Sequence, residues 1–236
     1  MPFSHGIVMA RILTRAPGNG FQVWPQQRTL AMLRPLAAIA LALLCALPPV
    51  PAQAQDHSPA EVAAIKDAVF NGPGLPVMGN AQGDAVLVEF SDYNCGFCRK
   101  SAPQVMALLQ SDPGLRLVVH EIPIFGEGSR FAAEAALAAQ AQGKYAEFHR
   151  ALMAMRGKAE KPSVLRVARE VGLDVARLQR DMQSPEITRR IERSLALADE
   201  IGLVGTPSFI AGDRAIFGYL SKDDLAELVA EARAAK

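Results

Sequence analysis

The feature that most constrains this chain is an apolar stretch that leads directly into two cysteines. Residues 86–90 are apolar except for Glu89, which is typical of a strand covered on both faces. From residue 98 to residue 110 the apolar side chains recur at helical spacing. Cys95 and Cys98 therefore lie at the predicted start of a helix, where free backbone N–H groups stabilise a thiolate. This placement favours redox chemistry at the pair.

Two other uses of the C-x-x-C pair compete with this interpretation. A zinc site needs about four ligands, whereas the only further cysteine is Cys45 and the four histidines show no C-x-x-C…H-x₃₋₅-H spacing. A purely structural disulfide is the other alternative, but such bridges seldom close so short a ring. The pattern predicts a catalytic dithiol, with no metal and no other cofactor.

Residues 1–54 differ in composition from the rest of the chain. They contain four arginines and no acidic residue, and their apolar run at 36–47 is too short to span a bilayer comfortably. Prolines end this run, and Ala52-Gln53-Ala54 matches the A-x-A pattern of a signal-peptidase site. We therefore expect a cleaved signal peptide and a mature chain that begins near Gln55. Met32 is an alternative translation start, because a compact signal peptide could begin there.

The expected mature chain holds only Cys95 and Cys98, because Cys45 lies inside the predicted signal peptide. An even number of cysteines in an exported chain fits an oxidising compartment. Without the four N-terminal arginines, 21 basic and 24 acidic residues remain, which is a net charge of −3. This charge balance does not suggest a nucleic-acid partner, and the sequence shows no stripe of basic residues.

The segments that follow predict alternating strands and helices. Residues 55–70 form a short amphipathic helix, and 76–83 form a loop or an edge segment. Residues 115–120 are predicted to be a strand that lies parallel to the first one. A helical insertion, with Ser129 as a candidate N-cap, covers about 129–201.

The sheet resumes at residues 207–211 and 215–218, which a hairpin turn joins, and an amphipathic helix ends the chain. The order is strand–helix–strand, helical insertion, strand–strand–helix, which is a layered α/β fold. We divide the chain into a removed segment at 1–54, an N-terminal helix and loop at 55–84, and one α/β domain at 85–236.

A family resemblance rests on three places in the sequence. They are Glu89-Phe90-Ser91-Asp92-Tyr93-Asn94-Cys95-Gly96-Phe97-Cys98, then Pro103 in the following helix, and Gly205-Thr206-Pro207 before the third strand. In this order and spacing the chain resembles the DsbA-like thiol–disulfide oxidoreductases of the bacterial periplasm. The resemblance covers essentially all of the expected mature chain. It implies a thioredoxin-like fold, with a central mixed sheet and an inserted helical subdomain.

The resemblance also implies a role for three residues of the site. Cys95, at an exposed helix terminus, would be the nucleophile that forms mixed disulfides, with a pKa in the range of about 3.5–7.5. Cys98, one turn further on and shielded, would resolve the mixed disulfide by attacking Cys95. Glu89, on a strand expected to be buried, would exchange the proton of the Cys98 thiol. An exposed acid at a sheet edge is the alternative for Glu89.

Thr206, Pro207 and Phe97 are the expected substrate-binding residues. The resemblance places a cis proline beside the dithiol, so we expect a cis bond between Thr206 and Pro207. The backbone of Thr206 could then pair with an extended client segment, and Phe97 would add an apolar docking surface. For Phe125 and Phe217, packing in the core is the favoured interpretation and docking is the alternative.

One departure from the strongly oxidising members of the family affects the expected direction of the reaction. The dipeptide between the cysteines is Gly96-Phe97 and not Pro-His, so one source of thiolate stabilisation is absent. A less stabilised reduced form is a weaker oxidant. Gly-Phe and the threonine before Pro207 resemble the periplasmic isomerases more closely.

We therefore expect a periplasmic enzyme that exchanges disulfides with cysteine-containing exported proteins and with a membrane redox partner, such as a quinone-linked oxidase. The alternative is a disulfide isomerase or reductase that a membrane electron donor keeps reduced. A hypothesis from another class is a non-catalytic, chaperone-like binding module with the same fold. The presence of Cys95, Cys98, Glu89 and Pro207 together argues against that module.

Overall fold

Strand β3 (Ala85–Ser91) lies inside a mixed sheet and has a paired strand on each side. The computed structural model describes residues 6–8 and 57–235. Within it, β3 is parallel to β4 (Leu115–Glu121) and antiparallel to β5 (Ser208–Ala211), so the predicted parallel pairing is confirmed. All but one of the β3 residues are buried, as expected for a strand that is covered on both faces.

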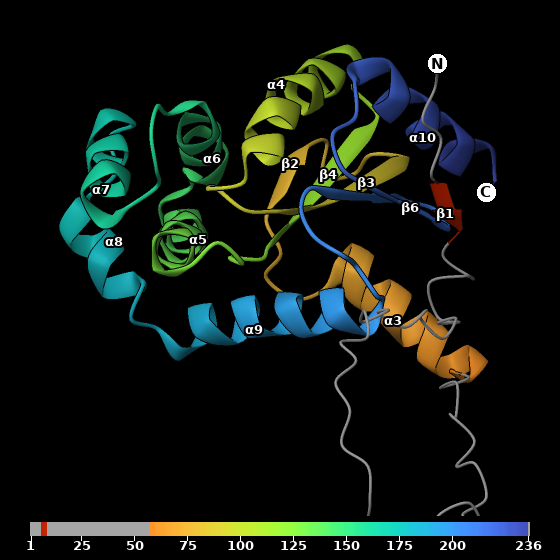
Figure 1. Cartoon of the computed structure of the whole chain (residues 1–236), viewed down its shortest axis with the longest axis horizontal. Helices are drawn as coiled ribbons and strands as arrows, with labels where there is room; N and C mark the ends of the chain where they lie inside the picture. Colours follow the sequence, from red (N-terminus) through yellow and green to blue (C-terminus); the bar gives the residue numbers. More distant parts are fainter. Residues whose placement is uncertain (1–5, 9–56, 236) are drawn as a thin grey trace, which may run out of the picture. The chain divides into compact units, whose positions relative to one another are not determined.

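The outer strands complete the order β1-β6-β5-β3-β4-β2 (Figure 1). Strand β6 (Arg214–Phe217) forms the predicted hairpin with β5. Strand β2 (Val77–Gly79) pairs antiparallel with β4 and falls in the segment expected to be a loop or an edge. The short strand β1 (Gly6–Val8) pairs antiparallel with β6 and was not expected. Three residues are too few to show the alternation that marks a strand in a sequence.

The helical insertion lies between β4 and β5. Its elements are α5 (Glu127–Ala139), the 3₁₀ turn η1 (Gln140–Gln142), α6 (Tyr145–Ala154), α7 (Lys161–Glu170), α8 (Val175–Asp181) and α9 (Pro185–Glu200). The prediction that Ser129 caps the first of these helices is wrong, because α5 begins at Glu127 and its N-cap residue is Gly126. The Ser129 hydroxyl donates instead to the buried carboxylate of Asp92 at 2.7 Å.

Two apolar clusters cover the two faces of the sheet. Successive side chains of β3 point to opposite faces, so they belong alternately to one cluster and to the other. Leu87 packs on the face that is covered by α4 (Gly96–Ser111) and α10 (Lys222–Ala234). Val88 and Phe90 pack on the opposite face. Because side chains alternate along a strand, Glu89 points to the same face as Leu87, beneath α4.

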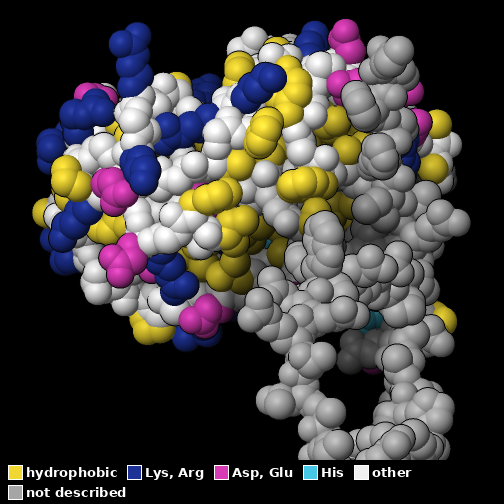
Figure 2. Space-filling view, viewed as in Figure 1, with side chains coloured by type: hydrophobic (Ala, Val, Ile, Leu, Met, Phe, Trp, Pro, Cys, Tyr) yellow, Lys and Arg dark blue, Asp and Glu magenta, His cyan; other side chains and the backbone are white. Residues whose placement is uncertain are grey.

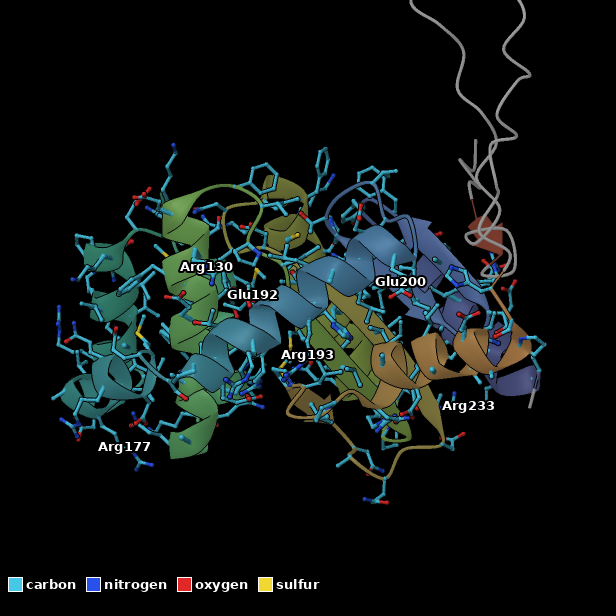
Figure 3. The ribbon with its side chains drawn as sticks, turned by 90° about the horizontal axis from the view of Figure 1, so that it is seen from below. Arg130, Arg177, Glu192, Arg193, Glu200 and Arg233 are labelled. Atoms are coloured by element: carbon cyan, nitrogen blue, oxygen red, sulfur yellow. The ribbon has the colours of Figure 1, made fainter. Side chains whose placement is uncertain are left out.

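The second face of the sheet is covered by α3 (Pro59–Asn71) and α9, which Figure 3 shows crossing it next to each other. Ser58 caps α3 and Pro59 is its first residue. Ile65 and Val69 are the buried residues of α3 and pack against the sheet and α9. His120, on β4, is buried here, with Nε2 3.0 Å from the Val69 carbonyl oxygen. The N-terminal helix is therefore an integral part of the core.

The predicted signal peptide, including its cleavage site and Met32, lies outside the described residues apart from the short strand β1. Within 6–8 and 57–235, none of the helices has both the length and the apolar character needed to cross a membrane.

The packing of α3 predicts that it unfolds together with the rest of the domain. Val69→Ala removes two buried methyl groups from a fully buried side chain, so we expect the free energy of unfolding to fall by about 2 kcal/mol. Val62→Ala, at a half-buried position on the same helix, should have a clearly smaller effect. Urea denaturation checks both variants; a helix that is only loosely attached would give no change for Val69→Ala.

Candidate active site

Cys95 is the N-cap residue of α4, so its sulfur lies where the backbone N–H groups of the first turn have no helical partner. Its Sγ accepts a hydrogen bond from the backbone N–H of Cys98 at 3.4 Å. In its protonated form Cys95 also donates to the carbonyl oxygen of Thr206, which lies 3.3 Å from Sγ. Neither cysteine is part of a disulfide in this structure. The predicted dithiol is thus held between the start of α4 and the segment before β5.

The expectation of an exposed Cys95 is wrong, since only 3% of the residue is accessible. The Thr206 carbonyl approaches the sulfur from a segment distant in the sequence and shields it. A hydrogen bond from the Cys98 thiol lowers the pKa of Cys95 to about 5, and the nearby Thr206 side chain and the backbone N–H groups of Phe97 and Cys98 act in the same direction, while burial opposes it. A pKa of about 5 favours the thiolate form of Cys95 at neutral pH.

The pKa of Cys98 is shifted in the opposite direction, although this cysteine is only three residues away. It is fully buried, and burial raises the pKa of its thiol strongly. Its hydrogen bond to Cys95 and the nearby charge of Glu89 raise the pKa further. Cys98 therefore keeps its proton unless a base removes it.

Glu89 is a buried acid, with 1% of its surface accessible, so the alternative of an exposed edge residue does not apply. The hydroxyl of Ser91 donates to Glu89 Oε1 at 2.9 Å. Burial raises the pKa of Glu89 to about 7, although the hydrogen bond from Ser91 acts in the other direction. At neutral pH its carboxyl group can both accept and release a proton.

The peptide bond between Thr206 and Pro207 is cis, as predicted. The Pro207 carbonyl accepts a hydrogen bond from the backbone N–H of Gly218 at 2.8 Å, which fixes this segment to the end of β6. Gly205 lies against Phe217, because a Cβ atom at Gly205 would be 3.0 Å from the Phe217 ring. The structure thus brings Thr206 and Pro207 beside Cys95.

Two polar residues that were not singled out from the sequence organise the surroundings of Cys95. The carboxylate of Asp92, 1% accessible, accepts hydrogen bonds from the backbone N–H groups of Asn94, Ile124 and Phe125 and from the Ser129 hydroxyl. The Asn94 side chain bonds to the backbone of the loop between α6 and α7. Short polar side chains directly after a buried strand are a signal for such backbone contacts, and could have identified both residues.

Exposed phenylalanine side chains come from three segments near the dithiol. Phe97 is 61%, Phe125 55% and Phe217 52% accessible. The interpretation of Phe125 and Phe217 as core residues is therefore wrong. Asp92 holds the backbone of Phe125 at the surface, and Phe217 ends an outer strand beside Gly205. Figure 2 shows hydrophobic side chains gathered near the middle of the face that it presents.

Within the described part of the chain, no group of three or more His, Cys, Asp or Glu side chains is arranged to hold a metal ion.

Residues 86–230 match the protein family described as "DSBA-like thioredoxin domain". A solved thioredoxin-like oxidoreductase from Silicibacter pomeroyi DSS-3 is 53% identical, with a TM-score of 0.71 over 72% of this chain and 99% of that one. A periplasmic thioredoxin-like protein from Salmonella enterica serovar Typhimurium is 29% identical, with a TM-score of 0.65 over 72% and 97%. The thiol-disulfide exchange protein alpha-DsbA2 from Wolbachia pipientis is 27% identical, with a TM-score of 0.68 over 73% and 94%.

Longer proteins contain a segment similar to this chain. The Na(+)/H(+) antiporter NhaA 3 of Salinispora tropica is 29% identical over 158 residues, which are 66% of this chain and 24% of the antiporter. The chain therefore spans about a quarter of the length of these curated relatives. A match to a quarter of the antiporter is no basis for assigning transport activity to this chain.

The raised pKa of Glu89 predicts a pH-dependent gain in stability when the carboxyl group is replaced. An acid whose pKa rises on folding contributes stability at low pH, and that contribution is lost as the pH rises from about 4.5 to about 7. Glu89→Gln should therefore unfold like the wild type at pH 4.5 but be more stable by about 3 kcal/mol above pH 7. Chemical denaturation across this range checks it, and a pH-independent difference would contradict it.

The hydrogen bond from Cys98 predicts how the Cys95 thiolate responds to substitution. Cys98→Ala removes the donor, so the pKa of Cys95 should rise, whereas Cys98→Ser keeps a hydroxyl donor and should raise it less. Thiolate absorbance during a pH titration reports the pKa in both variants. Equal values for the alanine and serine variants would show that the side chain of residue 98 does not stabilise the thiolate.

Proposed function

The chain belongs to the DSBA-like thioredoxin domain family, and from this premise we propose that it is a periplasmic thiol–disulfide oxidoreductase that transfers disulfides to exported proteins. The observation that carries this proposal is the contrast between two neighbouring thiols. Cys95 accepts hydrogen bonds that stabilise its thiolate, whereas Cys98 is buried and keeps its proton. Cys95 is thus suited to act as nucleophile and as leaving group, whereas Cys98 stays protonated until it attacks a mixed disulfide.

In the donor direction, the enzyme begins with a disulfide between Cys95 and Cys98. A client thiolate attacks Cys95 Sγ, which forms a mixed disulfide and releases Cys98 as a thiolate that takes a proton. A second client thiolate then attacks the client sulfur of the mixed disulfide. The client gains a disulfide and loses two electrons, and Cys95 leaves as the stabilised thiolate of the reduced enzyme.

Glu89 supplies the proton that Cys98 takes and recovers it when the reaction runs in reverse. Cys98 is fully buried, so water does not reach its sulfur readily. The carboxyl group of Glu89 lies beneath α4 and influences the pKa of the Cys98 thiol. Its own pKa of about 7 lets it act as acid or base at neutral pH.

Client segments bind across Cys95. The cis segment at Thr206 and Pro207 offers backbone beside the sulfur, and Phe97, Phe125 and Phe217 surround it with apolar surface. An extended, partly unfolded chain can use both kinds of contact, through backbone hydrogen bonds and buried apolar side chains. The clients are cysteine-containing exported proteins that have not completed folding.

The periplasmic location follows from the predicted signal peptide and is supported by the similar periplasmic protein of Salmonella enterica. Each disulfide that is donated leaves the enzyme with two extra electrons. A membrane partner, such as a quinone-linked oxidase, must accept them if turnover is to continue.

The second candidate is a disulfide isomerase or reductase that a membrane electron donor keeps reduced. The Gly96-Phe97 dipeptide favours it, since no histidine lies between the cysteines to stabilise the thiolate further.

A test of the function uses the mature protein and an unfolded, reduced client with two cysteines. Oxidised enzyme should convert the client to its disulfide form stoichiometrically, and Cys95→Ala should abolish the transfer. Mass spectrometry of the trapped client measures both. If oxidised enzyme leaves the reduced client unchanged, but reduced enzyme rearranges a scrambled client, the isomerase candidate replaces the donor.

The phenylalanine surface predicts selectivity for peptides over small disulfides. Phe125→Ser and Phe217→Ser each remove apolar area, so KM for a peptide substrate should rise severalfold while the reaction with glutathione disulfide stays the same. Val77→Ser, at an exposed apolar position on β2, is the matched control. Equal changes for the peptide and for glutathione disulfide would contradict a docking role.

A further inference from the structure

A loop with two basic side chains borders the dithiol. Residues 155–160 join α6 to α7, and we call this segment the basic loop. Its Arg156 and Lys158 are exposed, whereas its Ala159 is completely buried. The proposed function gives the basic loop no role, so its charges need a separate explanation.

The basic loop is held in place by residues on both sides of Cys95. The side chain of Asn94, the residue before Cys95, accepts from the Ala159 N–H at 2.7 Å and donates to the Ala159 carbonyl oxygen at 3.2 Å. Arg99, one turn after Cys95 in α4, donates through Nη1 to two carbonyl oxygens of the loop, at 3.2 and 2.5 Å. These hydrogen bonds fix the loop to the turn that carries the thiolate.

Helix α5 supports the same loop through a close backbone contact. A Cβ atom at Gly128 would be 2.4 Å from the Ala159 carbonyl oxygen, so this approach requires a glycine. Helix α5 also packs against α6 and α7, the two helices that the loop joins. The position of the loop relative to Cys95 is therefore set by the fold.

The two basic side chains of the loop have no acidic partner. Neither Arg156 nor Lys158 forms an ion pair within residues 6–8 and 57–235. By contrast, Arg130, Arg166 and Arg177 on neighbouring helices each pair with an acid one helical turn away. The cations of the basic loop are thus available to an acidic group of a bound partner.

The charge of this segment differs in sign from that of the expected mature chain. Residues 155–161 contain three basic residues and one acidic residue, which is a net charge of +2, against −3 for the expected mature chain. The single acid, Glu160, is turned toward α5, since its Oε2 would be 2.8 Å from a Cβ atom at Gly128. Figure 2 shows Lys and Arg side chains over the helical insertion, next to the hydrophobic side chains in the middle of that face.

We propose that Arg156 and Lys158 recognise acidic residues close to the client cysteine, so that the enzyme prefers acidic client segments. The inference rests on the proposed function and names the class of client. An extended chain advances about 3.3 Å per residue. Because the loop is bonded to the residue before Cys95, a client joined to Cys95 passes the loop within a few residues of its own cysteine.

A peptide client fits the basic loop better than a membrane surface does. Basic clusters that bind anionic lipids hold about 4–8 Lys or Arg residues, whereas this loop holds two, with Lys161 directly after it. The loop also lies beside the sulfur to which a client becomes attached. Charges at the rim of a binding surface act mainly on partner choice and on salt dependence, as a preference among clients requires.

The test measures the mixed disulfide itself. Mature Cys98→Ser protein stops at this stage, because residue 98 has no thiol to attack Cys95. The protein is loaded with a reference peptide and mixed with single-cysteine peptides that carry Glu, Gln or Lys two residues to either side of the cysteine. The incoming thiolate attacks Cys95 Sγ and the reference peptide leaves as a thiolate, so the exchange consumes no oxidant or reductant.

Mass spectrometry of the two mixed disulfides gives the equilibrium constant of each exchange. Every peptide is compared across protein variants, so the reactivity of its own thiol cancels. Exchanging both loop cations together, Arg156→Gln with Lys158→Gln, should weaken the mixed disulfide with the Glu peptide about fivefold at low ionic strength. The Gln peptide should be unaffected. Reversing both charges, Arg156→Glu with Lys158→Glu, should make the Lys peptide the preferred partner.

Two controls separate a local effect from the net charge of the protein. Arg169→Gln with Arg180→Gln removes two exposed charges on α7 and α8 that form no ion pair among the described residues, and should keep the preference for the Glu peptide. In about 1 M salt, where the Debye length is about 3 Å, the preference should largely disappear.

Equal constants for the Glu and Lys peptides with intact Arg156 and Lys158, or a control variant that loses the preference as the loop variant does, would overturn the proposal. It would also be overturned if the loop variant bound the peptides normally but lost binding of the mature protein to vesicles of anionic phospholipid. If no peptide forms a mixed disulfide with Cys95, the proposed function itself fails. The exchange does not depend on whether the enzyme donates or rearranges disulfides, so the two failures are distinguishable.

Discussion

The hydrogen bonds that converge on the Cys95 sulfur are the interaction on which the rest of the site depends. They come from the Cys98 thiol and from backbone N–H groups at the start of α4, and they stabilise the thiolate although the residue is almost inaccessible. A buried thiolate without such donors would be strongly disfavoured. The strand-to-helix junction therefore determines both where Cys95 lies and why it is acidic.

The register of the sheet places a second titratable group behind this junction. Alternation along β3 directs Glu89 beneath α4, whereas its neighbours Val88 and Phe90 pack on the opposite face. Burial then keeps the thiol of Cys98 protonated and raises the pKa of Glu89 to about 7. The Cys95 thiol is thus stabilised as an anion and the Cys98 thiol as an acid, and a carboxyl group with a pKa of about 7 lies close to them.

The sequence predicted those parts of the fold that depend on short segments. The buried strand, the helix start at Cys95 and the parallel return strand follow from local periodicity, and the cis bond at Pro207 followed from the family resemblance. The predictions that were wrong concern residues whose environment depends on contacts between distant segments. Cys95 is covered by a carbonyl group 111 residues away, and Phe125 is exposed because Asp92 holds its backbone. Neither contact leaves a periodic signal in the chain.

The redox equilibrium of the Cys95–Cys98 pair with glutathione tests the central claim most directly. Each pH unit by which the Cys95 pKa lies below ambient pH stabilises the reduced form by about 1.4 kcal/mol, or about 30 mV for two electrons. We predict a pair more oxidising than about −230 mV, although less so than the about −120 mV of the strongest oxidants of this kind. A potential near the about −270 mV of thioredoxin would contradict a thiolate-stabilised disulfide donor.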